Sequence, residues 1–467
     1  MSALEFDALN GRVSGDVVVP RSPDYELVRK SAMARFNEVR PAAIVRCETP
    51  ADVSATILFA RRTGLPLSIR CGGHSVAGGS STEGIVIDVT PMRSVAVTDG
   101  IATVGAGVRL GDLYEALYEH GVTIPAGCGP SVGISGLTLG GGIGILGRRY
   151  GLTCDRLRRA QVVLADGRLI ECDEHQEPDL FWGLRGAGGG NFGVVTSLVF
   201  DTVPSPDTTV FHLLWPLEKA DALVATWQAW APAAPEDTDA TLRLSGGTGA
   251  EPARVELFGA VLGSEADAAE RLDAFVSRAQ VKPSSTWSRQ MAYPAAKRQL
   301  NDLDQSREAS PCESSGEGHV YTKSEFFRRA LDRQTIAALV QNLSREVASA
   351  RAREVAFMPW GGAYNQMVPD ATAFPHRNEL FLVQHLLETD PDAAEADRET
   401  GRSWLARSWA LLHRSGSGGV YPNFPDPDLP DWGRAYYGEN YGRLLQVKAT
   451  YDPDNLFSFQ QSLPLTR

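Results

Sequence analysis

The stretch of sequence that decides the fold is GCGPSVGISGLTLGGGIGILGRRYG, residues 127–151, in which ten of 25 residues are glycine. An ordered glycine loses more conformational entropy on folding than any other residue, so such a run needs a structural reason. Flexible linkers combine glycine with serine, whereas this run carries Ile134, Leu137, Leu139 and Ile143. Apolar side chains between glycines indicate backbone that lies close against a ligand or another segment. The glycine density predicts that no helix forms within the run.

Two more glycine-rich segments flank this run in the sequence. Arg70–Gly79 follows a strand predicted at residues 65–70, and Arg185–Gly193 contains three consecutive glycines. Successive backbone N–H groups of a glycine loop can point into one concavity, so such loops bind phosphate without a lysine. Together the three segments predict a phosphate-bearing ligand that is held by backbone in the N-terminal part of the chain.

Residues Gly142–Gly147 also match the GxGxxG pattern of nicotinamide-dinucleotide sites, with Asp166 at a suitable distance along the chain. That motif follows an apolar strand and opens a helix in the first strand-helix-strand unit. Here it follows further glycines, and Asp166 lies in a hairpin turn predicted at 165–167. The context therefore favours a different ligand, and an NAD-dependent dehydrogenase is an alternative that a yellow purified protein would exclude.

Strands and helices alternate from about residue 41 to residue 203. Thr49–Asp52 has the form of a capping box with proline at the first helical position, and Gly64 is expected to end that helix. The pair Asp99-Gly100 predicts a tight hairpin turn. The other elements expected here are a strand over 84–89, a helix over 110–118, and a hairpin with strands over 161–164 and 168–172.

A segment with two prolines at 201–206 predicts a domain boundary. Beyond it we expect helices over 265–278 and 333–349 and strands over 208–215, 253–261 and 378–387. From residue 415 the chain returns to glycine, proline and aromatic residues. The predicted division is residues 1–203, an inserted domain over 204–414, and a C-terminal segment over 415–467 that rejoins the first domain.

Composition disfavours several classes of protein. Acidic residues outnumber basic ones by 57 to 45, and a net charge of −12 disfavours nucleic-acid binding. No run of about 18 apolar residues predicts a membrane span. The N-terminus shows no signal peptide, so a cytoplasmic protein is expected, and the oligomeric state is left open. Free thiols and no metal site are expected because no close pairing occurs among Cys47, Cys71, Cys128, Cys154, Cys172 and Cys312.

Several separated motifs resemble one known family. Arg70-x-Gly-Gly-His74-Ser75, the run from Gly133 to Gly142, and Asp179–Gly193 are similar to the FAD-binding domain of the vanillyl-alcohol-oxidase superfamily. The C-terminal motifs Tyr421–Phe424, Tyr437–Leu444 and Tyr451–Phe457 resemble those of berberine-bridge-enzyme-like oxidases. The resemblance implies an α+β fold class: a two-domain PCMH-type FAD-binding protein with an inserted substrate domain of antiparallel sheet plus helices.

The same resemblance implies how FAD is held. His74 matches the histidine that bonds covalently to the flavin 8α-methyl group. A second bond through a cysteine occurs in many relatives, but Cys128 lies one residue before the matching position, which is Gly129. The sequence leaves this second bond open. The implied cofactor-binding residues are Arg70, Gly72, Gly73, His74, Ser75, Cys128, Val132, Gly133, Gly136, Gly140, Gly142, Gly193 and Asn455.

The resemblance also implies catalytic residues. Tyr421 matches the family's active-site tyrosine, a base that removes the substrate proton as hydride leaves for the flavin, and Asn423 is expected to place its ring. A tyrosine with a pKa of about 10 must be lowered to act near neutrality, so we expect a cation or hydrogen-bond donor beside it. Gln384 lies where some relatives carry an acidic base, and an amide cannot accept that proton. Trp360 and Tyr364 are expected to help wall the substrate pocket.

The predicted function is an FAD-dependent oxidase of an alcohol, hemiacetal or amine carbon in a small natural product or sugar. Its partners would be that small molecule and O₂, with H₂O₂ as product. Val132 matches a gatekeeper position at which valine leaves room for O₂. The alternatives are a flavin dehydrogenase that uses another acceptor, and a covalent flavoprotein that binds or stores without turnover.

Overall fold

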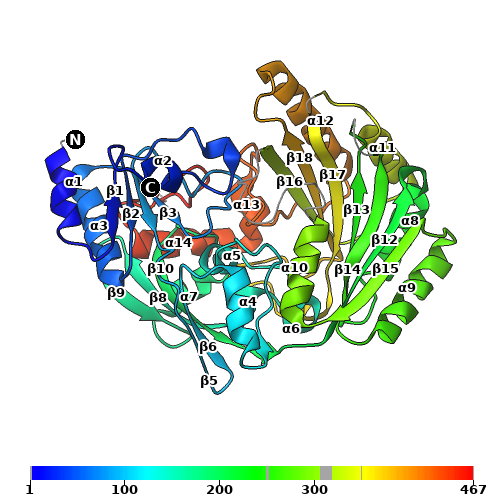
Figure 1. Ribbon diagram of the computed structural model, residues 1–467, viewed down its shortest axis with the longest axis horizontal. Coiled ribbons are helices and arrows are strands. Elements are labelled where there is room, and N and C mark those ends of the chain that lie inside the picture. The colour runs from blue at the N-terminus through cyan, green and yellow to red at the C-terminus, as the bar shows by residue number, and fades with distance from the viewer. Residues whose placement is uncertain (1–2, 249–251, 305–317, 349, 466–467) are drawn as a thin grey trace.

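A computed structural model of the chain describes residues 3–248, 252–304, 318–348 and 350–465, and Cys312 lies outside these ranges. Figure 1 shows the N-terminal strands and helices beside a large sheet built from the middle of the chain. Both chain ends lie on the side of the N-terminal elements. Among the described residues, no helix has the length and apolar character needed to cross a membrane.

The N-terminal part contains three small sheets. The four-stranded sheet has the order β1-β2-β4-β3, with β2, β4 and β3 parallel. A five-stranded antiparallel sheet has the order β5-β6-β10-β8-β9, and β7 pairs with β11. The strands are β1 (Asp16–Val18), β2 (Ala43–Arg46), β3 (Leu67–Arg70), β4 (Ile85–Asp88), β5 (Val95–Thr98), β6 (Ile101–Gly105), β7 (Val122–Thr123), β8 (Leu157–Leu164), β9 (Leu169–Cys172), β10 (Gly193–Asp201) and β11 (Val203–Pro204).

The middle of the chain forms one seven-stranded antiparallel sheet with the order β15-β12-β14-β13-β17-β18-β16. In Figure 1, helices α8, α9, α11 and α12 lie on its outer side, whereas α10 lies between the sheet and α4. The strands are β12 (Thr208–Pro216), β13 (Thr238–Ser245), β14 (Arg254–Val261), β15 (Ser285–Met291), β16 (His319–Phe327), β17 (Ala350–Pro359) and β18 (Phe381–Thr389).

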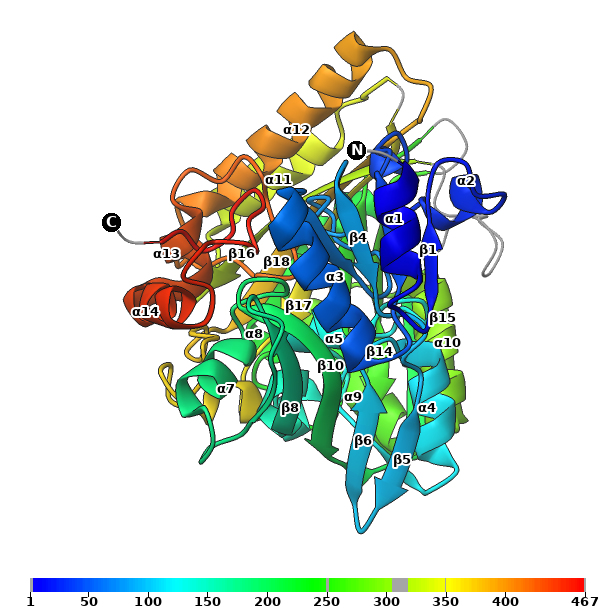
Figure 2. The same ribbon diagram turned by 90° about the vertical axis from the view of Figure 1, so that its left-hand side faces the viewer.

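Helices complete the layers around these sheets. Figure 2 shows α3 lying along the N-terminal strands beside α1. The helices are α1 (Ala3–Asn10), α2 (Tyr25–Val28), α3 (Pro50–Thr63), α4 (Leu110–Tyr118), α5 (Ile134–Leu139), α6 (Gly147–Tyr150), α7 (Pro178–Leu184), α8 (Ala220–Trp230), α9 (Glu265–Ala279), α10 (Tyr293–Asp304), α11 (Arg333–Leu343), α12 (Glu395–His413), α13 (Trp432–Tyr437) and α14 (Tyr441–Tyr451). Short 3₁₀ turns lie at Ala34–Phe36, Thr153–Arg156, Leu217–Lys219, Gly362–Asn365 and Gly438–Asn440.

Local sequence signals correctly predict several of these elements. The capping box at Thr49 is formed with Asp52, and Gly64 ends α3 in the left-handed conformation. Asp99 and Gly100 both have positive φ, as the turn between β5 and β6 requires. The helix expected over 333–349 is shorter, because α11 ends at Leu343.

The prediction that residues 127–151 contain no helix is wrong. Two short helices, α5 and α6, form within the run. In α5, Gly133 and Gly140 are the capping residues, so the helix between them contains a single glycine, Gly136. Glycine at helix ends relaxes the backbone instead of breaking the helix.

The C-terminal segment returns to the N-terminal elements, where α14 packs on α7. Lys448 and Asp452 form a fully buried ion pair, with Nζ and Oδ2 2.7 Å apart. The Lys448 ammonium also donates to the backbone carbonyls of Asn191 at 2.9 Å and Phe457 at 2.7 Å. This pair therefore fixes the C-terminal tail against the third glycine loop.

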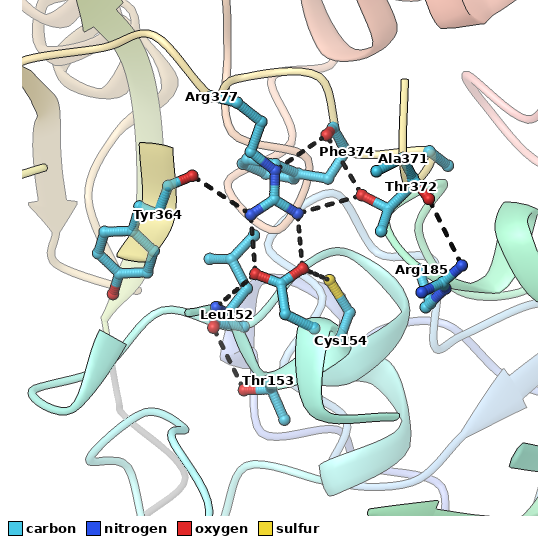
Figure 3. Close-up of polar contacts among 12 residues, drawn as sticks. Leu152, Thr153, Cys154, Arg185, Tyr364, Ala371, Thr372, Phe374 and Arg377 are labelled. Carbon is cyan, nitrogen blue, oxygen red and sulfur yellow. Dashed lines mark hydrogen bonds and ion pairs between the residues drawn. The ribbon is translucent and has the colours of Figure 1, made fainter. Parts of the chain in front are cut away.

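A second buried ion pair joins the middle of the chain to its N-terminal part. Arg377 Nη2 lies 2.6 Å from Asp155 Oδ1, and Nη1 lies 2.8 Å from Oδ2. Figure 3 shows the guanidinium surrounded by Tyr364, Thr372 and Phe374. Thr372 Oγ1 accepts at 3.1 Å and the Phe374 carbonyl at 3.4 Å. Every side of the planar cation therefore has a fixed partner.

Arg148 links the same two parts of the chain, but here the arginine lies in the N-terminal part and its acceptors lie in the middle segment. It lies in α6, is 1% exposed, and donates to backbone carbonyls of the middle segment. Its acceptors are Pro232, Ala234, Pro235, Thr238 and Trp360. A buried cluster that includes Leu152, Trp360, Phe374 and Tyr421 packs at this junction.

Replacing Arg377 with methionine should lower the free energy of unfolding by about 3–5 kcal/mol, because Asp155 would be left as a buried carboxylate without its cation. Chemical denaturation followed by tryptophan fluorescence measures this loss. Arg407 is exposed on α12, and Arg407→Met should change the same quantity by less than about 0.5 kcal/mol. Equal losses in both variants would contradict the role given to the buried pair.

Candidate flavin and substrate cavity

A cavity of about 2760 Å³ lies between the glycine loops and the seven-stranded sheet. Its floor includes all three glycine segments, and its roof includes residues of β13, β17 and β18. The volume exceeds that of a usual single-ligand pocket, about 300–1000 Å³. The cavity therefore has room for a dinucleotide together with a second, smaller molecule.

Most of the sequence-predicted site residues meet at this cavity. The catalytic candidates Tyr421 and Asn423 line it together. The cofactor candidates that line it are Arg70, Gly72, Gly73, His74, Ser75, Cys128, Val132, Gly133, Gly136 and Gly193. The structure thus collects residues from both ends of the chain at one wall.

The lining glycines leave space for a ligand. A Cβ atom on Gly136 would meet no protein atom within 4 Å, and one on Gly189 would meet only Leu139 Cδ1, at 3.8 Å. Both glycines line the cavity, so a side chain there would occupy cavity volume. These backbone surfaces fit a cofactor such as FAD, which binds through phosphates and a flat ring.

Other glycines serve contacts within the protein. A Cβ on Gly72 would lie 2.4 Å from the Gly133 nitrogen, and one on Gly133 would lie 2.1 Å from Cys71 Sγ. Real Cβ atoms do not approach so closely, so these positions allow the first two glycine loops to pack backbone against backbone. This packing fixes His74 relative to the loop at 127–133.

Three predicted cofactor residues, Gly140, Gly142 and Asn455, are not among the residues that line the cavity. A Cβ on Gly140 would lie 2.0 Å from Asn423 Oδ1. The Gly142 N–H donates to the Tyr421 hydroxyl at 3.0 Å. These two glycines therefore position the catalytic candidates, whereas Asn455 has positive φ in a turn closed on Asp452.

Arg70 lines the cavity, but its guanidinium is bound by protein groups. It donates to the backbone carbonyls of Val28, Arg29 and Ser80 at 2.9–3.1 Å. The side chain is 5% exposed. Arg70 therefore shapes the cavity wall by joining two loops.

His74 and Cys128 have different surroundings. His74 Nε2 lies 2.9 Å from Ser131 Oγ, and burial together with Arg109 lowers the pKa of His74 to about 4. Burial raises the pKa of Cys128, although the Lys297 ammonium, 3.9 Å from its sulfur, acts in the opposite direction. The imidazole is therefore held in its neutral, nucleophilic form, and the thiol in its less reactive, protonated form.

Tyr421 is held by two donors to its phenolic oxygen. The Gly142 N–H lies 3.0 Å away, and Asn423 Nδ2 lies 3.1 Å away. The same Asn423 amide donates to the Leu137 carbonyl at 2.8 Å, which fixes its orientation. Asn423 thus links the Tyr421 hydroxyl to the Leu137 carbonyl.

The expected lowering of the Tyr421 pKa is wrong in direction. Burial raises this pKa to about 12, and the two donors only reduce the increase. No cation within the described residues pairs with the phenol. Both donors nevertheless point at the oxygen, so they stabilise the phenolate more than the phenol.

The wall of the cavity that the seven-stranded sheet forms carries both aromatic and charged side chains. Trp360 and Tyr364 stack with ring centroids 4.2 Å apart. Gln384 extends from β18 and donates to Thr322 Oγ1 at 3.1 Å. Asp239 of β13 also lines the cavity, and burial raises its pKa to about 6 against the opposing effect of Arg148 and Lys297.

Sequence reasoning missed several residues of this site. Ser131 was visible only as part of the loop, and nothing local pairs it with His74. Lys297, Asp239 and Arg148 come from elements whose polar residues carry no motif. Only the folded chain brings Ser131 and Asp239 to the cavity wall and places Lys297 and Arg148 close enough to affect the pKa values of the wall residues Cys128 and Asp239.

Glycine loops that line such a cavity, with a buried tyrosine at one wall, define a flavin-dependent oxidoreductase. Residues 41–173 match the family model described as FAD binding domain, and residues 420–464 match the one described as berberine and berberine like. The solved structure of Physcomitrella patens BBE-like 1 superposes with a TM-score of 0.89 at 27% identity, covering 99% of each chain. The predicted α+β, PCMH-type fold class is confirmed by this likeness.

Curated relatives agree over nearly the whole chain. The uncharacterized FAD-linked oxidoreductase YgaK of Bacillus subtilis (strain 168) is 32% identical over 98% of both chains. Berberine bridge enzyme-like 1 of Arabidopsis thaliana is 30% identical over 96% of this chain and 90% of the relative. Chitooligosaccharide oxidase of Gibberella zeae is 30% identical over 91% of this chain and 87% of the relative. The chain belongs to the berberine bridge enzyme-like family of FAD-linked oxidoreductases.

Proposed function

We propose that the protein is an oxidase that takes hydride from an alcohol, hemiacetal or amine carbon of a small natural product or sugar. FAD would accept the hydride and pass two electrons to O₂, forming H₂O₂. The observation that carries the proposal is the Tyr421 phenol, which faces the cavity with two N–H donors on its oxygen. A relative that is named an oxidase supports it.

In this proposal Tyr421 takes the proton of the substrate O–H or N–H. The Gly142 and Asn423 donors stabilise the charge that the oxygen carries when it acts as base. Gln384 cannot accept the proton, but its amide, with Thr322, offers hydrogen bonds to a polar substrate. Residues 1–203 and 415–467 would hold FAD, and residues 204–414 would roof the substrate.

Tyr421→Phe should slow anaerobic flavin bleaching by a substrate at least 100-fold, because general-base catalysis contributes about 10²–10⁴-fold. Because burial raises the Tyr421 pKa to about 12, the deprotonated fraction of the wild-type tyrosine rises with pH through the whole neutral range. The logarithm of the bleaching rate should therefore rise with a slope near one between about pH 7 and pH 10. A panel of alcohols, oligosaccharides, alkaloids and phenols supplies the substrate, and stopped-flow absorbance measures the rate.

The matched control is Tyr25→Phe, since Tyr25 is buried and donates to the Pro41 carbonyl away from the cavity lining. This variant should bleach at the wild-type rate. A flat pH profile in the wild type, or equal rates for Tyr421→Phe and Tyr25→Phe, would contradict the role of Tyr421. A flavin that no substrate bleaches would favour a binding or storage protein.

We further propose that FAD is covalently attached through His74 alone. The neutral His74 imidazole supports this proposal, and the raised pKa of Cys128 speaks against a second bond. Acid precipitation should leave the wild-type and Cys128→Ala pellets yellow, whereas His74→Ala should release all of its flavin. Colour released from the wild type would contradict attachment, and a lost spectral feature in Cys128→Ala would reveal a second bond.

The choice of O₂ as acceptor is proposed from Val132, which lines the cavity. A Cβ on the neighbouring Gly129 would lie 2.9 Å from Val132 Cγ2, so this corner has little spare volume. Val132→Leu adds one methylene and should slow reoxidation of the reduced enzyme by about tenfold or more, since overpacking costs about 1–3 kcal/mol.

Stopped-flow mixing with air-saturated buffer measures this rate. Val97→Leu, on β5 outside the cavity lining, is the control and should reoxidise like the wild type. Slow reoxidation of the wild type would indicate a dehydrogenase with another acceptor.

A further inference from the structure

His74 and Ser131 belong to two different glycine loops that meet at the cavity wall. His74 follows β3, and Ser131 precedes α5. The two loops are fixed to each other, because a Cβ on Gly72 would lie 2.6 Å from the Ser131 carbonyl oxygen. Within this rigid contact, His74 Nε2 lies 2.9 Å from Ser131 Oγ. The distance is that of a good hydrogen bond.

This contact decides which imidazole nitrogen is free to react. A neutral imidazole carries a proton on one nitrogen and a lone pair on the other. Burial and the nearby Arg109 keep His74 neutral, and a hydrogen bond to the Ser131 backbone acts in the opposite direction. The ring nitrogen that lies against the Ser131 hydroxyl is Nε2, and Nδ1 is the other nitrogen of the ring. A proton on Nε2 that is directed at Ser131 leaves the lone pair on Nδ1.

We propose that Ser131 is a positioning residue for covalent flavin attachment: its hydroxyl accepts the Nε2–H of His74 and so presents the Nδ1 lone pair to the flavin 8α-methyl group. The proposal rests on the attachment through His74 proposed above. It assigns to Ser131 a role before the catalytic cycle, in maturation of the holoenzyme.

Attachment at His74 would release two protons and two electrons. The new bond joins His74 Nδ1 to the 8α carbon, and one C–H bond of the methyl group breaks. The proton of that bond and the Nε2 proton, which leaves through Ser131 Oγ, are released. The electron pair of the C–H bond reduces the flavin, and O₂ reoxidises it. The two protons and two electrons appear in H₂O₂.

The test follows attachment directly and needs no substrate. Protein from riboflavin-starved cells is mixed with FAD, and the acid-stable flavin fraction is measured over time. Ser131→Thr keeps the hydroxyl, whereas Ser131→Val has the same shape without it. Attachment should match the wild type in Ser131→Thr and slow about tenfold in Ser131→Val and Ser131→Ala, the value of one hydrogen bond.

A second readout separates orientation from general damage. The flavin-histidine peptide of the wild type and Ser131→Thr should be linked only through Nδ1, whereas Ser131→Val should give both Nδ1 and Nε2 linkages. All three variants should bind noncovalent FAD with wild-type stoichiometry before attachment. Ser277→Ala, exposed on α9, is the matched control and should behave as the wild type.

Equal attachment rates and linkages in Ser131→Thr and Ser131→Val would overturn the role of Ser131 while leaving attachment at His74 intact. If the wild type itself holds no acid-stable flavin, or His74→Ala still does, the proposed attachment fails and this inference fails with it. The two failures are therefore distinguishable.

Discussion

Two buried guanidinium groups hold the N-terminal part of the chain to its middle segment. Arg377 reaches from the middle segment to Asp155, and Arg148 reaches back to carbonyls of the middle segment. A buried cation is stable only when its donors are all satisfied, so each fixes several backbone atoms at once. Phe374, whose carbonyl accepts from Arg377, packs against Tyr421 with ring centroids 6.1 Å apart. The position of Tyr421 thus depends on a contact far from its phenolic oxygen.

Glycine supplies the second constraint, and the first two glycine segments use it in different ways. At Gly72 and Gly133 a side chain is excluded by another backbone, whereas at Gly136 it would fill the cavity. At Gly140 it would displace Asn423. Glycine therefore serves loop packing at some positions, leaves cavity space at others, and makes room for Asn423 at Gly140. These three uses can be told apart only when the atoms that surround each glycine are known.

The sequence predicts the features that depend on neighbouring residues and misses those that depend on residues far along the chain. The capping box of α3 and the turn at Asp99-Gly100 depend on neighbours within a few residues, and both were predicted correctly. The family motifs likewise brought Tyr421 and the glycine loops to one cavity. Helix α5 was missed because its glycines cap it. Arg377 and Asp155 are 222 residues apart in the sequence, so no local sequence pattern predicts their ion pair.

Burial shifts the pKa of each of these groups in the cavity wall toward its neutral form. It lowers the pKa of His74 to about 4, raises that of Tyr421 to about 12 and raises that of Asp239 to about 6. In such surroundings an isolated charge is costly, so in the proposed reaction proton removal by Tyr421 would become favourable only as hydride leaves the substrate. The N–H groups of Gly142 and Asn423 already point at the oxygen on which that charge develops. They need no reorganisation when it appears, and such prearranged donors are how a buried phenol can act as a base.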